Sequence, residues 1–154
     1  MTSKATVRPA SAEDRDAFLA LWEQFVASQP DEAGDRQMGA TNWARILDPD
    51  CALGCLLALD EAGRLVGFQL HLAFPFTWSQ RDACYLQDLF VTEAARGRGH
   101  ARALIEALAA LGRERGWFKI FWMTQHDNLT AQRLYDKVAV KCDYIRYDLA
   151  ISGS

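Results

Sequence analysis

Two extended apolar runs flank a helix-patterned segment in the middle of the chain, and this arrangement constrains the fold more than any other feature. The first run spans 83–91 and the second spans 117–124. From about 98 to 115, apolar residues recur at helical spacing, namely at Leu104, Ile105, Leu108 and Leu111. Gly116 then stands where a helix would end. A strand, a helix and a strand in this order predict two parallel strands in an α/β sheet.

Shorter segments on both sides predict further elements of the same sheet and its helices. We expect strands at 5–8, 51–59, 65–74 and 144–151. We expect helices from about 12 to 27, from 42 to 47, and after a cap at Asp127 or Asn128. A chain of 154 residues that is 50% hydrophobic can form a single domain spanning 1–154 with its own core.

The composition argues against several classes of protein. A net charge of −3 and a pI near 5.6 disfavour binding to nucleic acid or to an anionic membrane. The cysteines lack the paired spacing of a zinc site, so we expect no metal and reduced thiols: Cys51, Cys55, Cys84 and Cys142. Neither an apolar signal segment nor a run of ~18 apolar residues occurs, so a cytoplasmic protein that does not enter membranes is expected.

A glycine-rich turn, 93–101, joins the apolar run 83–91 to the helix-patterned segment. Glycines at 97 and 99 free the backbone, and a helix start offers unpaired N–H groups, so the turn suits a phosphate group. A Walker loop fails because His100-Ala101 follows the second glycine where Lys and Ser or Thr are needed. A dinucleotide fingerprint is disfavoured by Arg102 and by the late position of the turn. Spacing alone leaves open whether the turn binds phosphate or only connects two elements.

Two motifs resemble those of a known family. Arg96-Gly-Arg-Gly-His-Ala101 resembles the acetyl-CoA pyrophosphate loop of the GNAT N-acetyltransferases, whose pattern is Gln/Arg-x-x-Gly-x-Gly/Ala. Asn128-Leu-Thr-Ala-Gln-Arg-Leu-Tyr135 resembles the later Asn-x-x-Ala-x-x-Leu-Tyr motif of that family. The segment 85–91 is similar to a branch that includes histone- and polyamine-acetylating enzymes. The resemblance implies a GNAT fold: a mixed, mostly antiparallel sheet of six to seven strands with about four helices on both faces. It implies that the sheet splays between 83–91 and 117–124.

The resemblance also implies roles for individual residues. Backbone groups of Leu89, Phe90 and Val91 would contact the pantetheine arm and thioester, and the N–H of Phe90 or Val91 would hold the thioester oxygen. The pyrophosphate would be bound by the amides of Gly97, Arg98, Gly99, His100, Ala101 and Arg102. His100 itself is interpreted as a packing residue, and Arg96 would brace the loop or pair with phosphate.

Two residues of the later motif complete the implied donor site. Asn128 would bind pantetheine or position the next helix. Tyr135 would protonate the leaving thiolate, since a positioned phenol can share its proton as sulfur gathers charge.

The general base is less defined by the sequence. Where the polyamine enzymes have Glu, this chain has Gln87, which cannot accept a proton from an amine. Asp88 is the candidate base, although neighbouring strand residues face opposite sides and only one of the two can face the site. A water relay, His126 and Asp127 remain alternatives.

These observations predict an N-acetyltransferase that moves an acetyl group from acetyl-CoA to a primary amine. The acceptor could be a small amine, a polyamine, an amino acid, or a lysine or N-terminus of a protein. A CoA-binding regulatory module without turnover, or an acyltransferase that uses another acyl-CoA, is the alternative. The family suggests a homodimer, with the C-terminal strand as its contact. Phe74, Phe76 and Trp78 could line the acceptor entrance, form core or contact a partner.

Overall fold

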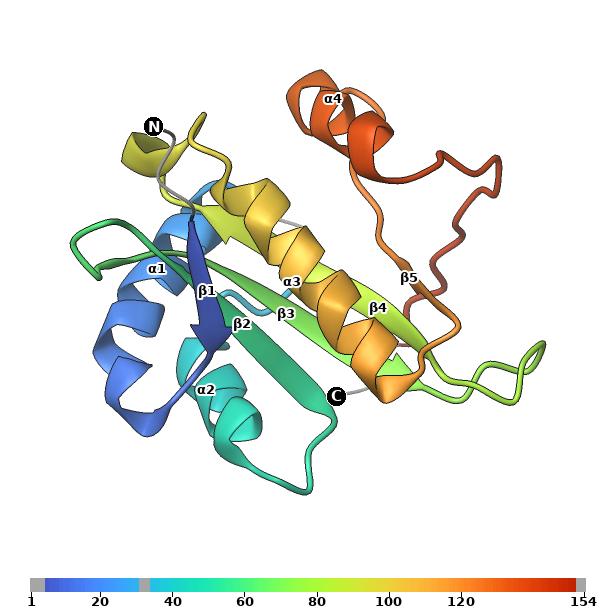
Figure 1. Cartoon of the computed structure of the whole chain (residues 1–154), viewed down its shortest axis with the longest axis horizontal. Coiled ribbons are helices and arrows are strands. Elements are labelled where there is room, and N and C mark those ends of the chain that lie inside the picture. Colours follow the sequence, from blue (N-terminus) through green and yellow to red (C-terminus); the bar gives the residue numbers. More distant parts are fainter. Residues whose placement is uncertain (1–4, 31–33, 152–154) are drawn as a thin grey trace. The chain divides into compact units, whose positions relative to one another are not determined.

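The computed structural model describes residues 5–30 and 34–151, and its elements follow in Figure 1. The strands are β1 (Thr6–Pro9), β2 (Leu53–Leu59), β3 (Leu65–Phe74), β4 (Ala83–Val91) and β5 (Lys119–Phe121). The helices are α1 (Arg15–Ala27), α2 (Gly39–Leu47), α3 (His100–Arg115) and α4 (Leu129–Val138). Short 3-10 turns, η1 (Ala12–Asp14) and η3 (Glu93–Ala95), precede α1 and α3.

The chain divides into two compact units, Met1–Met123 and Thr124–Ser154, and each is described by itself. In the first unit the strands form one sheet in the order β1-β2-β3-β4-β5. Neighbouring strands are antiparallel from β1 to β4, whereas β4 and β5, which α3 connects along the chain, run parallel. The predicted strand–helix–strand unit and the mixed, mostly antiparallel sheet are therefore confirmed.

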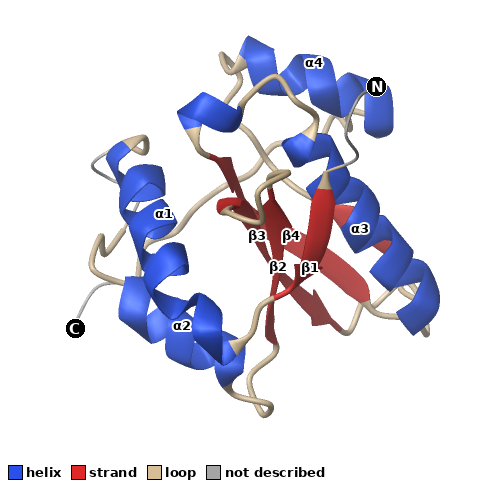
Figure 2. Cartoon of the chain, turned by 60° about the vertical axis from the view of Figure 1, so that its left-hand side comes forward, coloured by secondary structure: helices blue, strands red, loops and turns tan. Residues whose placement is uncertain are grey.

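Helices cover both faces of this sheet. Figure 2 shows α1 and α2 on one face and α3 on the other. On the first face the ring of Phe18 lies 5.2 Å from Phe68 of β3 and 5.1 Å from Trp43 of α2, measured between centroids. On the second face α3 buries Leu104 and Leu108. Each such side chain contributes about 1.5–3 kcal/mol by leaving water, so this packing holds the sheet and its helices together.

The ends of the helices follow local sequence signals. The N–H of Ser11 donates to Asp14 Oδ2 at 2.9 Å, which forms a capping box ahead of α1. Asp14 also accepts two hydrogen bonds of 2.8 Å from the guanidinium of Arg8 on β1. Gly116 ends α3 with φ of +75°, and the N–H of Trp117 then donates to the carbonyl of Gly112 at 2.9 Å. The prediction of Gly116 as the C-terminal cap is confirmed.

The β5 strand pairs with only one end of β4. Their register joins Ala83 to Lys119 and Tyr85 to Phe121, whereas β4 continues to Val91. The two strands therefore diverge after Tyr85, as the resemblance predicted. The strand is shorter than the predicted 117–124, since the N–H of Trp117 donates to α3 and the pairing with β4 runs only from Lys119 to Phe121.

The second unit contains α4 and a C-terminal segment without helix or strand, 139–151. The prediction of a strand over 144–151 is wrong, and so is the count of six to seven strands, since the described residues form five. An alternation of apolar side chains defines the two faces of a strand. A strand also needs a neighbouring backbone to accept and donate its hydrogen bonds, and the alternation does not supply one.

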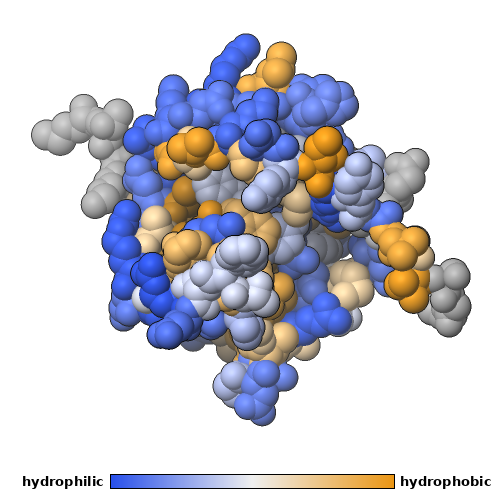
Figure 3. Space-filling model, turned by 90° about the vertical axis from the view of Figure 1, so that its right-hand side faces the viewer, coloured by the Kyte–Doolittle hydropathy of each residue, from blue (hydrophilic) through white to orange (hydrophobic). Residues whose placement is uncertain are grey.

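Several large apolar side chains are exposed. In the first unit Trp78, between β3 and β4, is 88% exposed. In the C-terminal segment the exposed apolar residues are Val140, Tyr144, Ile145, Tyr147, Leu149 and Ile151. Figure 3 shows hydrophobic residues, in orange, standing among hydrophilic ones on one face of the molecule. Single exposed apolar side chains are common on protein surfaces, whereas six within the twelve residues 140–151 are a local concentration.

Candidate active site

The glycine-rich turn after β4 has the backbone geometry of an anion site. Gly97 has φ of +76° and Gly99 has φ of +85°, values that residues with a Cβ rarely adopt. A Cβ added at either position would meet nothing within 4 Å, so backbone conformation alone requires glycine there. Gly99 is the residue immediately before α3, and its carbonyl accepts the first helical hydrogen bond, from Ala103 at 2.9 Å.

The first turn of α3 supplies donors to this site. The N–H groups of His100, Ala101 and Arg102 precede the first hydrogen-bonded N–H of the helix, so they have no acceptor within it. The partial positive charge at the start of a sixteen-residue helix adds to their attraction for an anion. The His100 side chain is buried on the inner face of α3, which agrees with its interpretation as a packing residue.

The three arginines of the turn have different surroundings. Arg96 donates from Nε to the carbonyl of Val91 at 3.1 Å, and its guanidinium lies 5.8 Å from the centroid of the Phe90 ring. It therefore braces the turn against the end of β4. Arg102 pairs with Glu106 one helical turn later at 2.9 Å. Arg98 is exposed beside the two glycines.

The backbone of β4 presents alternate groups to the edge that β5 does not cover. Thr92 donates its N–H to the carbonyl of Val66 at 2.8 Å, which fixes the phase of pairing with β3. In an antiparallel pair, successive residues direct their N–H and C=O groups to opposite sides. The backbone groups of Phe90 therefore point toward β3, and those of Leu89 and Val91 point toward the edge beyond Tyr85.

A β-bulge at Gln87 decides how Gln87 and Asp88 are oriented in β4. Leu70 of β3 pairs with Asp88, but the next residue, His71, pairs with Leu86, so Gln87 has no β3 partner. Asp88 then lies opposite Leu70, on the face that α1 and α2 cover, and Gln87 is exposed. Burial raises the pKa of the Asp88 carboxyl to about 6. Sequence reasoning missed this bulge, because a bulge is a feature of pairing between strands and carries no side-chain signature.

The second motif forms the start of α4 in the C-terminal unit. Asn128 caps this helix, since its Oδ1 accepts a hydrogen bond from Ala131 N at 3.3 Å, and its Nδ2 donates to Thr124 Oγ1 at 3.3 Å. Tyr135 follows seven residues later, which puts both side chains on one face of the helix. It is half-buried, and burial raises the pKa of its phenol. His126 and Asp127, the alternative bases, are exposed in the turn before the helix.

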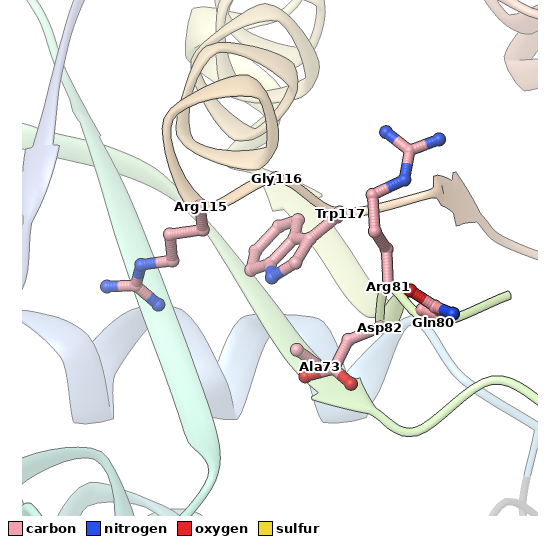
Figure 4. Close-up of a pocket in the computed structure, with 7 residues that line it drawn as sticks. All are labelled: Ala73, Gln80, Arg81, Asp82, Arg115, Gly116 and Trp117. Atoms are coloured by element: carbon pink, nitrogen blue, oxygen red, sulfur yellow. The ribbon is translucent and has the colours of Figure 1, made fainter.

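A surface pocket of about 520 Å³ lies at the opposite end of β4 and α3 from the glycine turn. Its lining residues are Ala73, Gln80, Arg81, Asp82, Arg115, Gly116 and Trp117. In Figure 4 the guanidinium groups of Arg81 and Arg115 lie on opposite sides of the central Trp117, and that of Arg115 lies 6.0 Å from the centroid of the Trp117 ring. Because these charges do not converge, the pocket lacks the arrangement that holds an anionic ligand. Among the described residues, no group of three or more His, Cys, Asp or Glu is placed to hold a metal ion.

A turn with glycines at positive φ follows β4, and the pairing of β4 with β5 ends at Tyr85, as expected from the resemblance to acyl-transferring proteins. The sequence model described as Acetyltransferase (GNAT) family matches residues 15–139, a span that includes both motifs. The chain therefore belongs to the GNAT family of acetyltransferases. Its activity is the acetyl-CoA-dependent transfer of an acetyl group to an amine.

Individual relatives agree with this assignment. The D-amino-acid N-acetyltransferase HPA3 of Saccharomyces cerevisiae (strain ATCC 204508 / S288c) is 34% identical over 148 residues, which are 96% of this chain and 91% of that protein. The crystal structure of an aminoglycoside acetyltransferase, HMB0005, from an uncultured soil metagenomic sample is 30% identical, with a TM-score of 0.79 over 97% of this chain and 100% of that one. These two relatives are named for different acceptors, so family membership does not define the acceptor of this chain.

A third relative supports the fold alone. The ribosomal-protein-alanine N-acetyltransferase from Brucella melitensis biovar Abortus 2308 is 24% identical. Its TM-score is 0.78 over 97% of this chain and 100% of that one.

Proposed function

We propose that this chain binds acetyl-CoA and transfers the acetyl group directly to a primary amine, in a ternary complex with no covalent enzyme intermediate. The observation that carries the proposal is the turn with glycines at positive φ at the start of α3, beside the uncovered edge of β4. A turn and helix start of this kind bind the pyrophosphate of a nucleotide-like donor. An extended edge pairs with the amide-containing arm of the same donor.

The donor's pyrophosphate is held by the amides from Gly97 to Arg102, with charge from Arg98. Arg96 keeps the turn in place through the carbonyl of Val91. Asn128 acts by positioning α4, which its capping hydrogen bonds support, and contact with pantetheine remains its second proposed role.

The backbone phase of β4 favours Val91 and Leu89 over Phe90 as donors to the bound thioester. Their N–H groups point toward the edge that the pantetheine arm would occupy, whereas those of Phe90 point toward β3 and its ring packs on Phe25 of α1. A fixed N–H at the thioester oxygen stabilises the negative charge that develops there during attack, and each such donor is worth roughly 3–4 kcal/mol of barrier.

Asp88 is the proposed general base and Tyr135 the proposed general acid. The amine nitrogen attacks the thioester carbon, the carbon–sulfur bond breaks, the amine proton passes to Asp88, and the thiolate takes the phenol proton of Tyr135. A carboxyl with a pKa of about 6 is ionised near pH 7 and is a stronger base than an ordinary aspartate. A phenol whose pKa is raised by burial keeps its proton through the same range.

An assay of CoA release with a panel of amines tests this proposal. Acetylation of at least one primary amine, with acetyl-CoA consumed in equal amount, is the expected result. Binding of acetyl-CoA without turnover of any amine would favour a regulatory module instead. Faster turnover with a longer acyl-CoA than with acetyl-CoA would favour a different donor.

The proposal extends to the assembly of the protein. The family match at 15–139 spans the division between the two units, which supports one catalytic domain over 1–154. A homodimer is proposed with the C-terminal segment as its contact, because its apolar side chains are exposed. Light scattering should give twice the mass of the chain, and a Tyr147→Ser, Leu149→Ser double variant should give a monomer. An unchanged mass in that variant would remove the segment from the interface.

We also propose that the protein acts in the cytoplasm and has no nucleic-acid or membrane partner. The described cysteines are all free thiols, which suits the reducing cytoplasm. Among the helices of the described part, none is long and apolar enough to cross a membrane. The net charge of −3 supports a partner other than nucleic acid.

A further inference from the structure

Packing on one face of the sheet limits the direction in which an acceptor can extend once its amine lies at Asp88. Asp88, Phe90 and Tyr85 share this face, because they pair with Leu70, Phe68 and Leu72 of β3. Beyond Asp88 toward the glycine turn, Phe90 is buried, with its ring 5.7 Å from Phe25 of α1. An amine at Asp88 therefore has its remaining atoms directed the other way along β4, toward Tyr85.

On that side the sheet carries an aromatic surface. The Tyr85 ring stacks on Phe121 of β5, with centroids 5.1 Å apart and planes within 9°. Phe74 meets the same Phe121 ring edge-on at 6.0 Å. Within the first unit, α1 and α2 pack on β3 and β2, and the rings of Phe74, Tyr85 and Phe121 are only partly buried. Flat, partly exposed rings favour an acceptor with an apolar or aromatic body.

Cations alternate with the rings at the far end of this surface. Lys119 Nζ lies 4.6 Å from the centroid of Phe76 and 5.9 Å from that of Phe121. Phe76 stacks on Phe118 at 5.4 Å, and the guanidinium of Arg81 lies 5.5 Å from the Phe118 ring. The rings hold both cations in place, so the positive charge stays at this end of the surface. Such a surface repels a polyamine and attracts an anionic group.

We infer that the acceptor is an acidic peptide with apolar residues that presents its amino terminus at Asp88 and lies over Tyr85 and Phe121 toward Lys119. This inference rests on the proposed function, because it takes Asp88 as the base. Lys119 pairs with Ala83, and the β3 partners of Ala83 and Asp88, Phe74 and Leu70, are four positions apart because Gln87 is bulged. At ~3.3 Å per position the two sites are roughly 13 Å apart, which is the span from the first to the fifth residue of an extended peptide. A free amino acid is too short to reach both groups, which selects a peptide.

The test uses pentapeptides with blocked C-termini, so that the two peptides differ in charge only at the side chain of the fifth residue. The acidic peptide is Ala-Phe-Ala-Ala-Glu amide and its partner is Ala-Phe-Ala-Ala-Arg amide. Values of kcat/KM from CoA release are compared for the natural protein, Lys119→Gln, and the control Arg113→Gln, which removes an exposed cation of α3 away from the aromatic surface. We expect the acidic peptide to be preferred at least about tenfold by the natural protein and by the control. The preference should fall to about threefold or less in Lys119→Gln.

Three results would overturn the inference. They are equal use of the two peptides by the natural protein, an unchanged preference in Lys119→Gln, and faster turnover of spermidine than of the acidic peptide. Phenethylamine, a small aromatic amine, is included so that failure of the peptide inference can be distinguished from failure of the proposed acetyltransferase function. Turnover of phenethylamine without peptide discrimination would refute the peptide acceptor alone. Absence of CoA release with every amine would refute both.

Discussion

The Asp88→Asn substitution should stabilise the protein while it abolishes most turnover, and this combination distinguishes a buried catalytic base from a structural acid. Burial raises the pKa of Asp88 to about 6, against about 3.9 in an unfolded chain. The difference of roughly 2 pKa units corresponds to at most about 3 kcal/mol, and partial exposure of the side chain reduces this to about 2 kcal/mol. An asparagine has no charge to bury, so it escapes this cost.

The sign of the pH dependence follows from the direction of the pKa. Below about pH 4 Asp88 is protonated in both the folded and the unfolded chain, and its charge has no effect on stability. As pH rises through about 6, the folded protein must ionise a buried group, and its free energy of unfolding falls. Asp88→Asn should therefore match the natural protein at pH 4 and exceed it by about 2 kcal/mol at pH 7.5.

Urea denaturation at pH 4 and pH 7.5 measures this difference, and CoA release under saturating acetyl-CoA measures turnover. We expect kcat to fall at least about 100-fold in Asp88→Asn, as for loss of a general base. The low-pH limb of kcat/KM, near pH 6 in the natural protein, should disappear with it. A variant that is less stable at pH 7.5 would refute the burial argument, and a variant with full turnover would refute the role of Asp88 as base.

Three further substitutions test other parts of the account. Tyr135→Phe should lower kcat at least about 100-fold with little change in acetyl-CoA affinity, which calorimetry measures. The control Tyr144→Phe, at an exposed position, should change neither quantity. Equal turnover in both variants would show that Tyr135 is not the acid. Gly99→Ala and Gly63→Ala both place a Cβ in open space at positive φ, and each should lower the free energy of unfolding, measured with urea, by about 1 kcal/mol. Only Gly99→Ala should weaken acetyl-CoA binding. Equal binding by the two variants would contradict the placement of the donor site at this turn. Asp14→Asn should lower the free energy of unfolding by about 1–2 kcal/mol at pH 7. The reason is that the hydrogen-bonded ion pair with Arg8 lowers the pKa of Asp14 to about 2 and stabilises the fold above pH 4. A free energy of unfolding of the natural protein that does not change between pH 4 and pH 2 would contradict this.

Much of the fold follows from local signals in the sequence. The β4 boundaries are those predicted, because a largely apolar run, interrupted only by Gln87 and Asp88, lies between the polar residues Asp82 and Thr92. The end of α3 is also as predicted, since Gly116 alone can adopt the left-handed conformation there without strain. These features depend on a few neighbouring residues, so they can be predicted from the local sequence alone.

Features that depend on pairing between distant residues were not predicted. The bulge at Gln87 arises from the register between β3 and β4, and it decides that Asp88 lies opposite Leu70. The stack of Tyr85 on Phe121 requires the parallel register of β4 and β5, whereas the sequence singled out Phe74, Phe76 and Trp78. The expected strand at 144–151 failed for the same reason, because alternation cannot supply a partner strand.

The central claim is that the turn from Arg96 to Arg102 binds acetyl-CoA as the donor for amine acetylation. Isothermal titration calorimetry of the full chain with acetyl-CoA, and separately with NAD, tests it most directly. The account predicts saturable binding of one acetyl-CoA per chain and no binding of NAD. Binding of NAD alone, or of neither compound, would contradict it.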